Sequence, residues 1–146
     1  GREVLPSLLA DPMSERSYGM FEAYAKSKLA QVACAAELQR REPGIVSVSL
    51  HPGNVYTEVT RRYPPLVRAA YGAFQPLLRG VQPTVVDGAS TSVFVAACAD
   101  PQPLRGAYYE RSAPVPPAPA AADVEVARQL YELSEQLVAP WSAPIL

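Results

Sequence analysis

Apolar residues recur at helical spacing in four stretches of the chain, and they alternate with polar residues in two shorter ones. The predicted helices cover residues 21–41, 66–78, 84–99 and 123–138. Thr84 and Asp123 begin the last two, as expected of residues that cap helix N-termini. Strands are predicted over residues 45–50 and 106–110, and a proline- and alanine-rich loop over residues 115–122.

The order of these elements predicts an α/β fold. Helices that alternate with strands are typical of a mostly parallel sheet covered by helices. Two strands are too few for such a sheet, because they would leave their edges and one apolar face exposed. We therefore expect residues 1–146 to form the C-terminal half of a larger domain. Its other strands would come from residues before Gly1 or from a partner chain, and a homodimer is left open.

Composition excludes several classes of protein. The 146 residues carry 13 basic and 14 acidic side chains, a balance without the basic excess that nucleic-acid binding requires. No apolar run reaches the length of a membrane span, and no secretory signal pattern is present. Cys34 and Cys98 lack metal-site spacing, so we expect buried thiols in a reducing, cytoplasmic protein, with a disulfide or an anchor upstream of Gly1 as alternatives.

Candidate chemistry lies in the first predicted helix. Its apolar positions at helical spacing are Phe21, Ala25, Leu29, Val32 and Ala36. Tyr24 and Lys28 are four residues apart, so they share one face of the helix. An ammonium about 4 Å from a phenol, at an effective dielectric of about 20, contributes about 4 kcal/mol, or about three units of phenol pKa. Such a phenol could act as a general acid or base on a carbonyl or alcohol, although the spacing could also arise by chance.

A second motif follows the first predicted strand. It reads Pro52-Gly53-Asn54-Val55-Tyr56-Thr57. In open parallel sheets ligands bind beyond the carboxyl ends of strands, and glycine lets the backbone approach them closely. The backbone of Val55 could pair with a ligand amide, and the Thr57 hydroxyl could donate to a phosphate. The alternative is an ordinary strand-end turn. His51 is the only histidine, so we expect no multi-histidine metal site and a structural role for this residue.

Together these motifs resemble the short-chain dehydrogenase/reductase superfamily. The residues that carry the resemblance are Tyr24-Ala25-Lys26-Ser27-Lys28-Leu29 and His51-Pro52-Gly53-Asn54-Val55-Tyr56-Thr57. Gly106-Ala107-Tyr108-Tyr109 and residues 127–135 add a likeness to the branch that contains retinol dehydrogenases and the WW-domain-containing oxidoreductase. The resemblance runs over residues 21–138.

The resemblance implies a Rossmann-type doubly wound parallel sheet, of which this chain would hold the C-terminal half. It implies hydride transfer between NADP or NAD and a small carbonyl or alcohol substrate. Tyr24 would be the general acid/base, and Lys28 would lower its pKa and bind the nicotinamide ribose. The residues implied to hold the nicotinamide and pyrophosphate are Pro52, Gly53, Asn54, Val55 and Thr57. Residues 58–80 would cover the substrate.

Parts of the family pattern are missing from the 146 residues. There is no glycine-rich phosphate loop, and no strand leads into a catalytic serine. We therefore expect that this chain alone is not a competent enzyme. A non-catalytic binding or interaction protein that keeps a partial fold remains an alternative. A third interpretation, a relative of sugar-nucleotide epimerases or dehydratases, has less support than these two. His51-Pro52-Gly53 followed by Thr57 argues against it.

Overall fold

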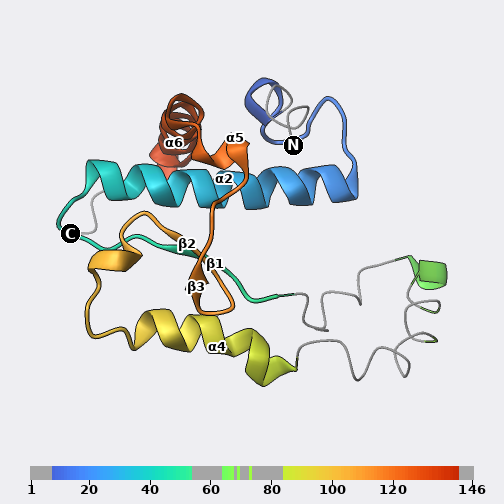
Figure 1. Ribbon diagram of the computed structural model, residues 1–146. Coiled ribbons are helices and arrows are strands. Elements are labelled where there is room, and N and C mark those ends of the chain that lie inside the picture. The colour runs from blue at the N-terminus through green and yellow to red at the C-terminus, as the bar shows by residue number, and fades with distance from the viewer. Residues whose placement is uncertain (1–7, 54–63, 68, 70–72, 74–83, 142–146) are drawn as a thin grey trace. The chain divides into compact units, whose positions relative to one another are not determined.

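The computed structural model describes residues 8–53, 64–67, 69, 73 and 84–141. Figure 1 shows a mixed α/β protein, and its described helices and strands are, in order, α2 (Met20–Arg41), β1 (Ser49–His51), α4 (Val85–Ala96), η2 (Gln102–Leu104), β2 (Tyr108–Glu110), β3 (Ala113–Pro114), α5 (Pro119–Ala122), α6 (Val124–Val138) and η3 (Ala139–Trp141). The chain divides into two compact units, one built around α2 and α6 and the other around α4.

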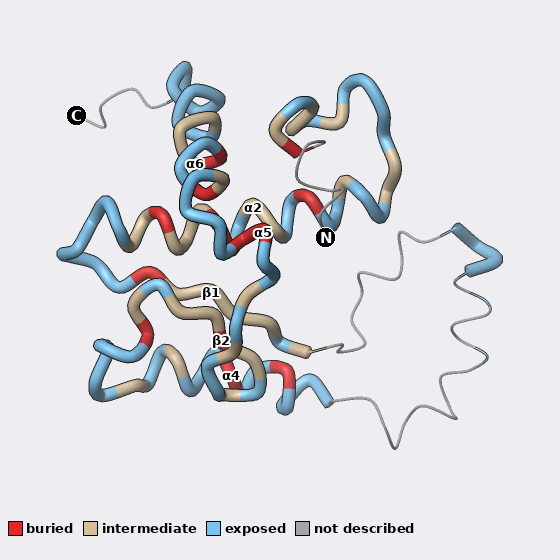
Figure 2. The backbone as a smooth tube through the Cα atoms, turned by 45° about the horizontal axis from the view of Figure 1, so that its top comes forward, coloured by how far each residue is buried: buried red, intermediate tan, exposed pale blue. Residues whose placement is uncertain are grey.

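The first unit is organised by α2, which confirms the helix predicted over residues 21–41 within one residue. Its core consists of Leu8, Ala33, Ala121, Ala127 and Leu130, which come from the N-terminal segment, α2, α5 and α6. Figure 2 shows the buried positions along α2 and α6 in red. Small alanine side chains let these helices approach closely.

The most buried residues of α2 are Lys26, Ala33 and Glu37. Of the five apolar positions at helical spacing, Leu29 and Val32 are partly buried and pack against the core cluster, whereas Phe21 and Ala25 are exposed. The fully buried apolar contact of α2 is therefore made by a small residue, Ala33, and not by its largest apolar side chain.

Helix α6 confirms the prediction for residues 123–138. The Asp123 carboxylate caps it, accepting from the backbone N–H groups of Glu125 at 2.9 Å and Val126 at 3.1 Å. The loop predicted over residues 115–122 is wrong in its second half, where α5 forms. Proline at a helix start followed by three alanines favours a helical turn, because proline fixes φ and alanine is the strongest helix former.

The second unit contains α4, whose start was predicted correctly. Thr84 and Asp87 form a reciprocal capping box: Thr84 Oγ1 accepts from the Asp87 backbone at 3.2 Å, and the Asp87 carboxylate accepts from the Thr84 backbone at 2.8 Å. The helix ends at Ala96, three residues before the predicted end. Most of the helix predicted over residues 66–78 lies outside the described residues; residues 65–67, 69 and 73 are helical.

The strands form one small sheet with the order β1-β2-β3. The sequence predicted two strands, and β3 is an addition. Backbone hydrogen bonds from Gly106 to Ser47 and from Ser49 to Ala107 advance together along both segments, which is the direction of a parallel pair. A turn with positive φ at Arg111 (51°) and Ser112 (59°) joins β2 to β3.

Strand β1 is shorter than predicted and begins four residues later. The reason lies in Ser47, whose N–H donates to Gln39 Oε1 at 2.9 Å and whose hydroxyl donates to the Ala35 carbonyl at 2.7 Å. The Ile45 carbonyl likewise accepts from Arg105 at 2.9 Å. Because the Ser47 N–H and the Ile45 carbonyl bond to the side chains of Gln39 and Arg105, these two backbone groups are not available for a strand ladder.

Cys34 and Cys98 were predicted to be buried, but both are only half-buried. Burial raises the pKa of the Cys34 thiol above its usual value, although a hydrogen bond with the Ser134 side chain acts in the opposite direction. In the part of the chain that the structure describes, no helix has the length and apolarity that crossing a membrane requires.

Candidate functional site

Helix α2 brings Tyr24 and Lys28 together, as their spacing predicts. The Lys28 ammonium lies over the Tyr24 ring, with Nζ 5.7 Å from the ring centroid. The hydroxyl of Ser27 donates to the Tyr24 carbonyl at 2.8 Å, a bond within the helix that leaves the phenol untouched. Both side chains are exposed, Tyr24 to 60%. The phenol is therefore accessible to a ligand.

Exposure weakens the electrostatic coupling that the sequence led us to expect. That expectation assumed about 4 Å and an effective dielectric of about 20; in bulk water the same pair interacts by only about 1 kcal/mol. The ammonium in the structure is beside the ring face of Tyr24 and is open to water. Strong coupling between Lys28 and the phenol thus requires that a ligand or further protein excludes water from this face of α2.

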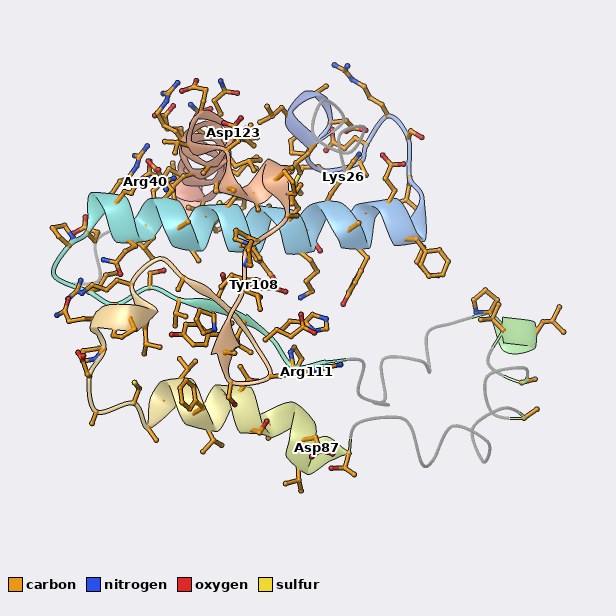
Figure 3. The ribbon with its side chains drawn as sticks, in the orientation of Figure 1. Lys26, Arg40, Asp87, Tyr108, Arg111 and Asp123 are labelled. Carbon is orange, nitrogen blue, oxygen red and sulfur yellow. The ribbon has the colours of Figure 1, made fainter. Side chains whose placement is uncertain are left out.

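The other lysine of the helix has a different environment. Lys26 is 2% exposed, and its ammonium lies 3.1 Å from a carboxylate oxygen of Glu22. Two helical residues correspond to a rotation of about 200°, so Lys26 projects from the side of α2 opposite to Tyr24 and Lys28. Figure 3 shows Lys26 above α2, on the side of the N-terminal segment. Lys26 is a buried structural cation and does not belong to the candidate site.

The predicted turn after the first strand is only partly described. Gly53 has a φ of 84°, in the left-handed region that favours glycine, and its N–H donates to His51 Nδ1 at 2.9 Å. This bond gives His51 the structural role that was expected of it. Pro52 and Gly53 follow β1 directly, whereas Asn54, Val55 and Thr57 lie outside the described residues, as do most of residues 58–80.

A hollow of about 290 Å³ opens in the first unit, beside the N-terminal segment, α2 and α6. Its α2 wall consists of Ala23, Ser27 and Ala30, and leucines of α6 form another wall. Neither Tyr24 nor Lys28 lines it. Among the described residues, no group of three or more His, Cys, Asp or Glu side chains could hold a metal ion.

No family model matches the chain, but several known proteins are similar to it in sequence. It is 35% identical over 121 residues to the "Putative daunorubicin C-13 ketoreductase DnrU" of Streptomyces sp. (strain C5), an alignment that covers 83% of this chain and 40% of that protein. It is 36% identical over 131 residues to retinol dehydrogenase 14 of Mus musculus, covering 88% and 39%. It is 32% identical over 128 residues to the WW domain-containing oxidoreductase of Homo sapiens, covering 86% and 30%.

The chain is a relative of the short-chain dehydrogenases/reductases. This confirms the resemblance inferred from the Tyr24–Lys28 and His51–Thr57 motifs. The chain spans between 30% and 40% of the length of these relatives.

One residue of this short-chain dehydrogenase/reductase relative was missed by the sequence reasoning. Gln31 Oε1 accepts a hydrogen bond from the Lys28 ammonium at 3.1 Å. An exposed glutamine on a helix does not by itself indicate a function. The feature of the sequence that could have indicated Gln31 is its position three residues after Lys28, on the same helix face.

Proposed function

We propose that the protein containing this chain is an NAD(P)-dependent oxidoreductase that acts on a carbonyl or alcohol substrate. The observation that carries the proposal is the pairing of Tyr24 with Lys28 on an exposed face of α2. The names of the relatives, a ketoreductase, a retinol dehydrogenase and an oxidoreductase, support the same type of reaction.

In this proposal Tyr24 exchanges a proton with the substrate oxygen. When a carbonyl is reduced, its carbon gains a hydride and its oxygen takes the proton of the Tyr24 hydroxyl; when an alcohol is oxidised, both steps reverse. Lys28 stabilises the phenolate that Tyr24 becomes, through the positive charge of its ammonium. The nicotinamide, when bound, supplies or accepts the hydride.

The cofactor, NADP or NAD, would be held by Tyr24, Lys28 and the segment from Pro52 to Thr57. The described part of that segment fits such a ligand. Gly53 adopts a positive φ at the carboxyl end of β1, and this edge of a parallel sheet is where ligands bind. The absence of a side chain on Gly53 lets a ligand come close to the backbone.

We propose further that residues 1–146 contribute the C-terminal half of a Rossmann-type domain. The parallel pairing of β1 with β2 agrees with such a sheet. Large apolar side chains on α4 remain exposed, Val85 to 71%, Val86 to 78% and Val93 to 63%. Burying them against further strands and helices would stabilise the domain, at about 25 cal/mol per Å² of apolar surface removed from water.

Tyr24→Phe in the intact protein tests the proposed function. The change removes the hydroxyl that exchanges the proton and keeps the ring, and Lys28 and the segment from Pro52 to Thr57 still hold the cofactor. We therefore expect turnover to fall about 10²- to 10⁴-fold while nicotinamide binding is nearly unchanged. The assay follows reduced nicotinamide by absorbance with a panel of carbonyl compounds and alcohols, and cofactor binding by calorimetry.

Tyr131→Phe is the matched control. The Tyr131 ring stacks under the Arg41 guanidinium at 4.6 Å, and phenylalanine keeps that contact. We expect this variant to turn over as the wild type does. Wild-type turnover in Tyr24→Phe would reject the role of Tyr24. Cofactor binding without any turnover in the wild type would favour the non-catalytic alternative.

A further inference from the structure

Three polar side chains are aligned on one face of α2. Tyr24, Lys28 and Gln31 are separated by four and then three residues, so they lie one turn apart along the helix. Lys28 lies between the other two, with its ammonium over the Tyr24 ring and bonded to Gln31 Oε1 at 3.1 Å. Gln31 therefore holds the ammonium from the turn that follows Lys28.

Lys28 needs such a contact because its side chain is long and exposed. A lysine ammonium is a point charge on a flexible four-carbon stem, and its interaction with another group weakens with distance. Among the conformations open to Lys28, only those near Tyr24 stabilise a phenolate. In the structure the conformation of Lys28 that bonds to Gln31 Oε1 is also the one that places its ammonium over the Tyr24 ring, so this hydrogen bond favours that conformation.

The neutrality of the Gln31 acceptor distinguishes Lys28 from the other cations of α2. Lys26 is paired with the carboxylate of Glu22 at 3.1 Å, and Arg41 with that of Glu37 at 2.8 Å. A carboxylate partner offsets the positive charge of its cation, whereas an amide oxygen bonds to it without adding negative charge. Among the described residues, therefore, none offsets the charge of Lys28 as Glu22 offsets that of Lys26.

We propose that Gln31 is a positioning residue, which holds the Lys28 ammonium beside Tyr24 through a neutral hydrogen bond. This inference rests on the proposed function, because the value of the position lies in the proton exchange at Tyr24. Gln31 acts through Lys28 and needs no contact with the substrate.

Two variants of the intact protein test separately the hydrogen bond to Lys28 and the absence of charge on its acceptor. Gln31→Leu removes the acceptor, and Gln31→Glu keeps an acceptor of similar length but adds a negative charge. We expect the pH profile of kcat for alcohol oxidation to move to higher pH in both, by about half a unit to one unit, which corresponds to about three- to tenfold less turnover at neutral pH. The shift should be larger for Gln31→Glu.

Gln129→Leu is the matched control, because Gln129 is an exposed glutamine of α6 whose amide bonds to Glu125 at 2.7 Å. Its pH profile should match that of the wild type. If the wild type turns over normally and both Gln31 profiles stay in place, the positioning role is wrong and the proposed function stands. If the wild type shows no turnover, the proposed function fails, and the positioning role fails with it.

A second experiment tests the hydrogen bond between Lys28 and Gln31 without measuring turnover. Acylation of the two lysines by an amine-reactive ester is measured by peptide mass spectrometry, with buried Lys26 as internal reference. The Lys28 amine must leave its acceptor to react, so we expect acylation at least about twofold faster in Gln31→Leu and slower in Gln31→Glu. Unchanged Lys28 rates in both variants would show that the Gln31 contact does not hold the ammonium, and would overturn the proposal.

Discussion

The two faces of α2 both carry charged and polar side chains, but one face packs inside the first unit and the other is exposed. On the buried face, Lys26, Ala33 and Glu37 pack against the rest of the first unit. On the open face, Tyr24 and Lys28 are exposed. Lys26 is paired with the carboxylate of Glu22 and Glu37 with the guanidinium groups of Arg40 and Arg41, whereas the ammonium of the open face has a neutral amide as its acceptor.

The difference follows from the cost of burying charge. An unpaired ion in a protein interior is strongly destabilising, so Lys26 and Glu37 need partners of opposite charge. Water solvates an exposed ammonium, so Lys28 does not need a carboxylate, and none of the described residues supplies one. This distinguishes the face of α2 that packs in the first unit from the face on which we propose the chemistry.

Overpacking the buried face should give the largest effect on stability. Ala33 is fully buried in the core cluster beside Ala127 and Leu130. Ala33→Leu inserts three carbons into this contact, and we expect it to lower the free energy of unfolding by about 1–3 kcal/mol in urea denaturation. Ala25→Leu, at an exposed position of the same helix, should change it by less than about 0.5 kcal/mol. Equal losses in the two variants would show that the two faces do not differ in packing.

A smaller effect is expected when the buried carboxylate is neutralised. Hydrogen bonds from Arg41 and Arg40 hold the pKa of Glu37 below its usual value of 4.5. A carboxyl whose pKa is lowered on folding stabilises the protein above its unfolded pKa, and this contribution is lost as the pH falls through the folded pKa. We therefore expect Glu37→Gln to reduce stability near neutral pH and to flatten the loss of stability that sets in as the pH falls below about 4.5.

The measurement is urea unfolding at a series of pH values. Some slope should remain in Glu37→Gln, because the pKa values of Asp11, Asp87 and Glu125 are also lowered by hydrogen bonds. Glu42→Gln, an exposed carboxylate just after α2, serves as the control and should retain the wild-type slope. A Glu37→Gln profile parallel to that of the wild type would contradict the account of the buried face.

Helix boundaries could be predicted well where local chemistry sets them. The start of α4 depends on the Thr84–Asp87 capping box, and the start of α6 on Asp123, interactions among residues at most three apart. The extent of β1 could not be predicted, because Ser47 is bonded to Gln39 and Ala35 on a different element. The buried face of α2 could not be predicted either, since the choice of Ala33 over Phe21 depends on which surface α6 covers.

The candidate site likewise has features that the sequence could predict and features that it could not. The pairing of Tyr24 with Lys28 could be predicted because a helix brings residues four apart together. Their solvent exposure could not, and it makes the coupling in the described structure weaker than the sequence estimate. The role of Gln31 depends on the conformation of the Lys28 side chain, which spacing alone does not determine. The positive φ of Gly53 agrees with the predicted turn, while cofactor binding by Gly53 and by the other named residues stays a prediction.

The most direct test of the account compares the two lysines of α2 in the intact protein. Lys28→Met and Lys26→Met each remove one ammonium and keep a long apolar stem, and they lie on opposite faces of the same helix. We predict that kcat/KM falls about 100-fold or more in Lys28→Met, as expected when a general acid/base loses its partner, and stays within about threefold of wild type in Lys26→Met. Equal losses in the two variants, or a larger loss in Lys26→Met, would contradict the division of α2 into a stabilising face and a chemical face.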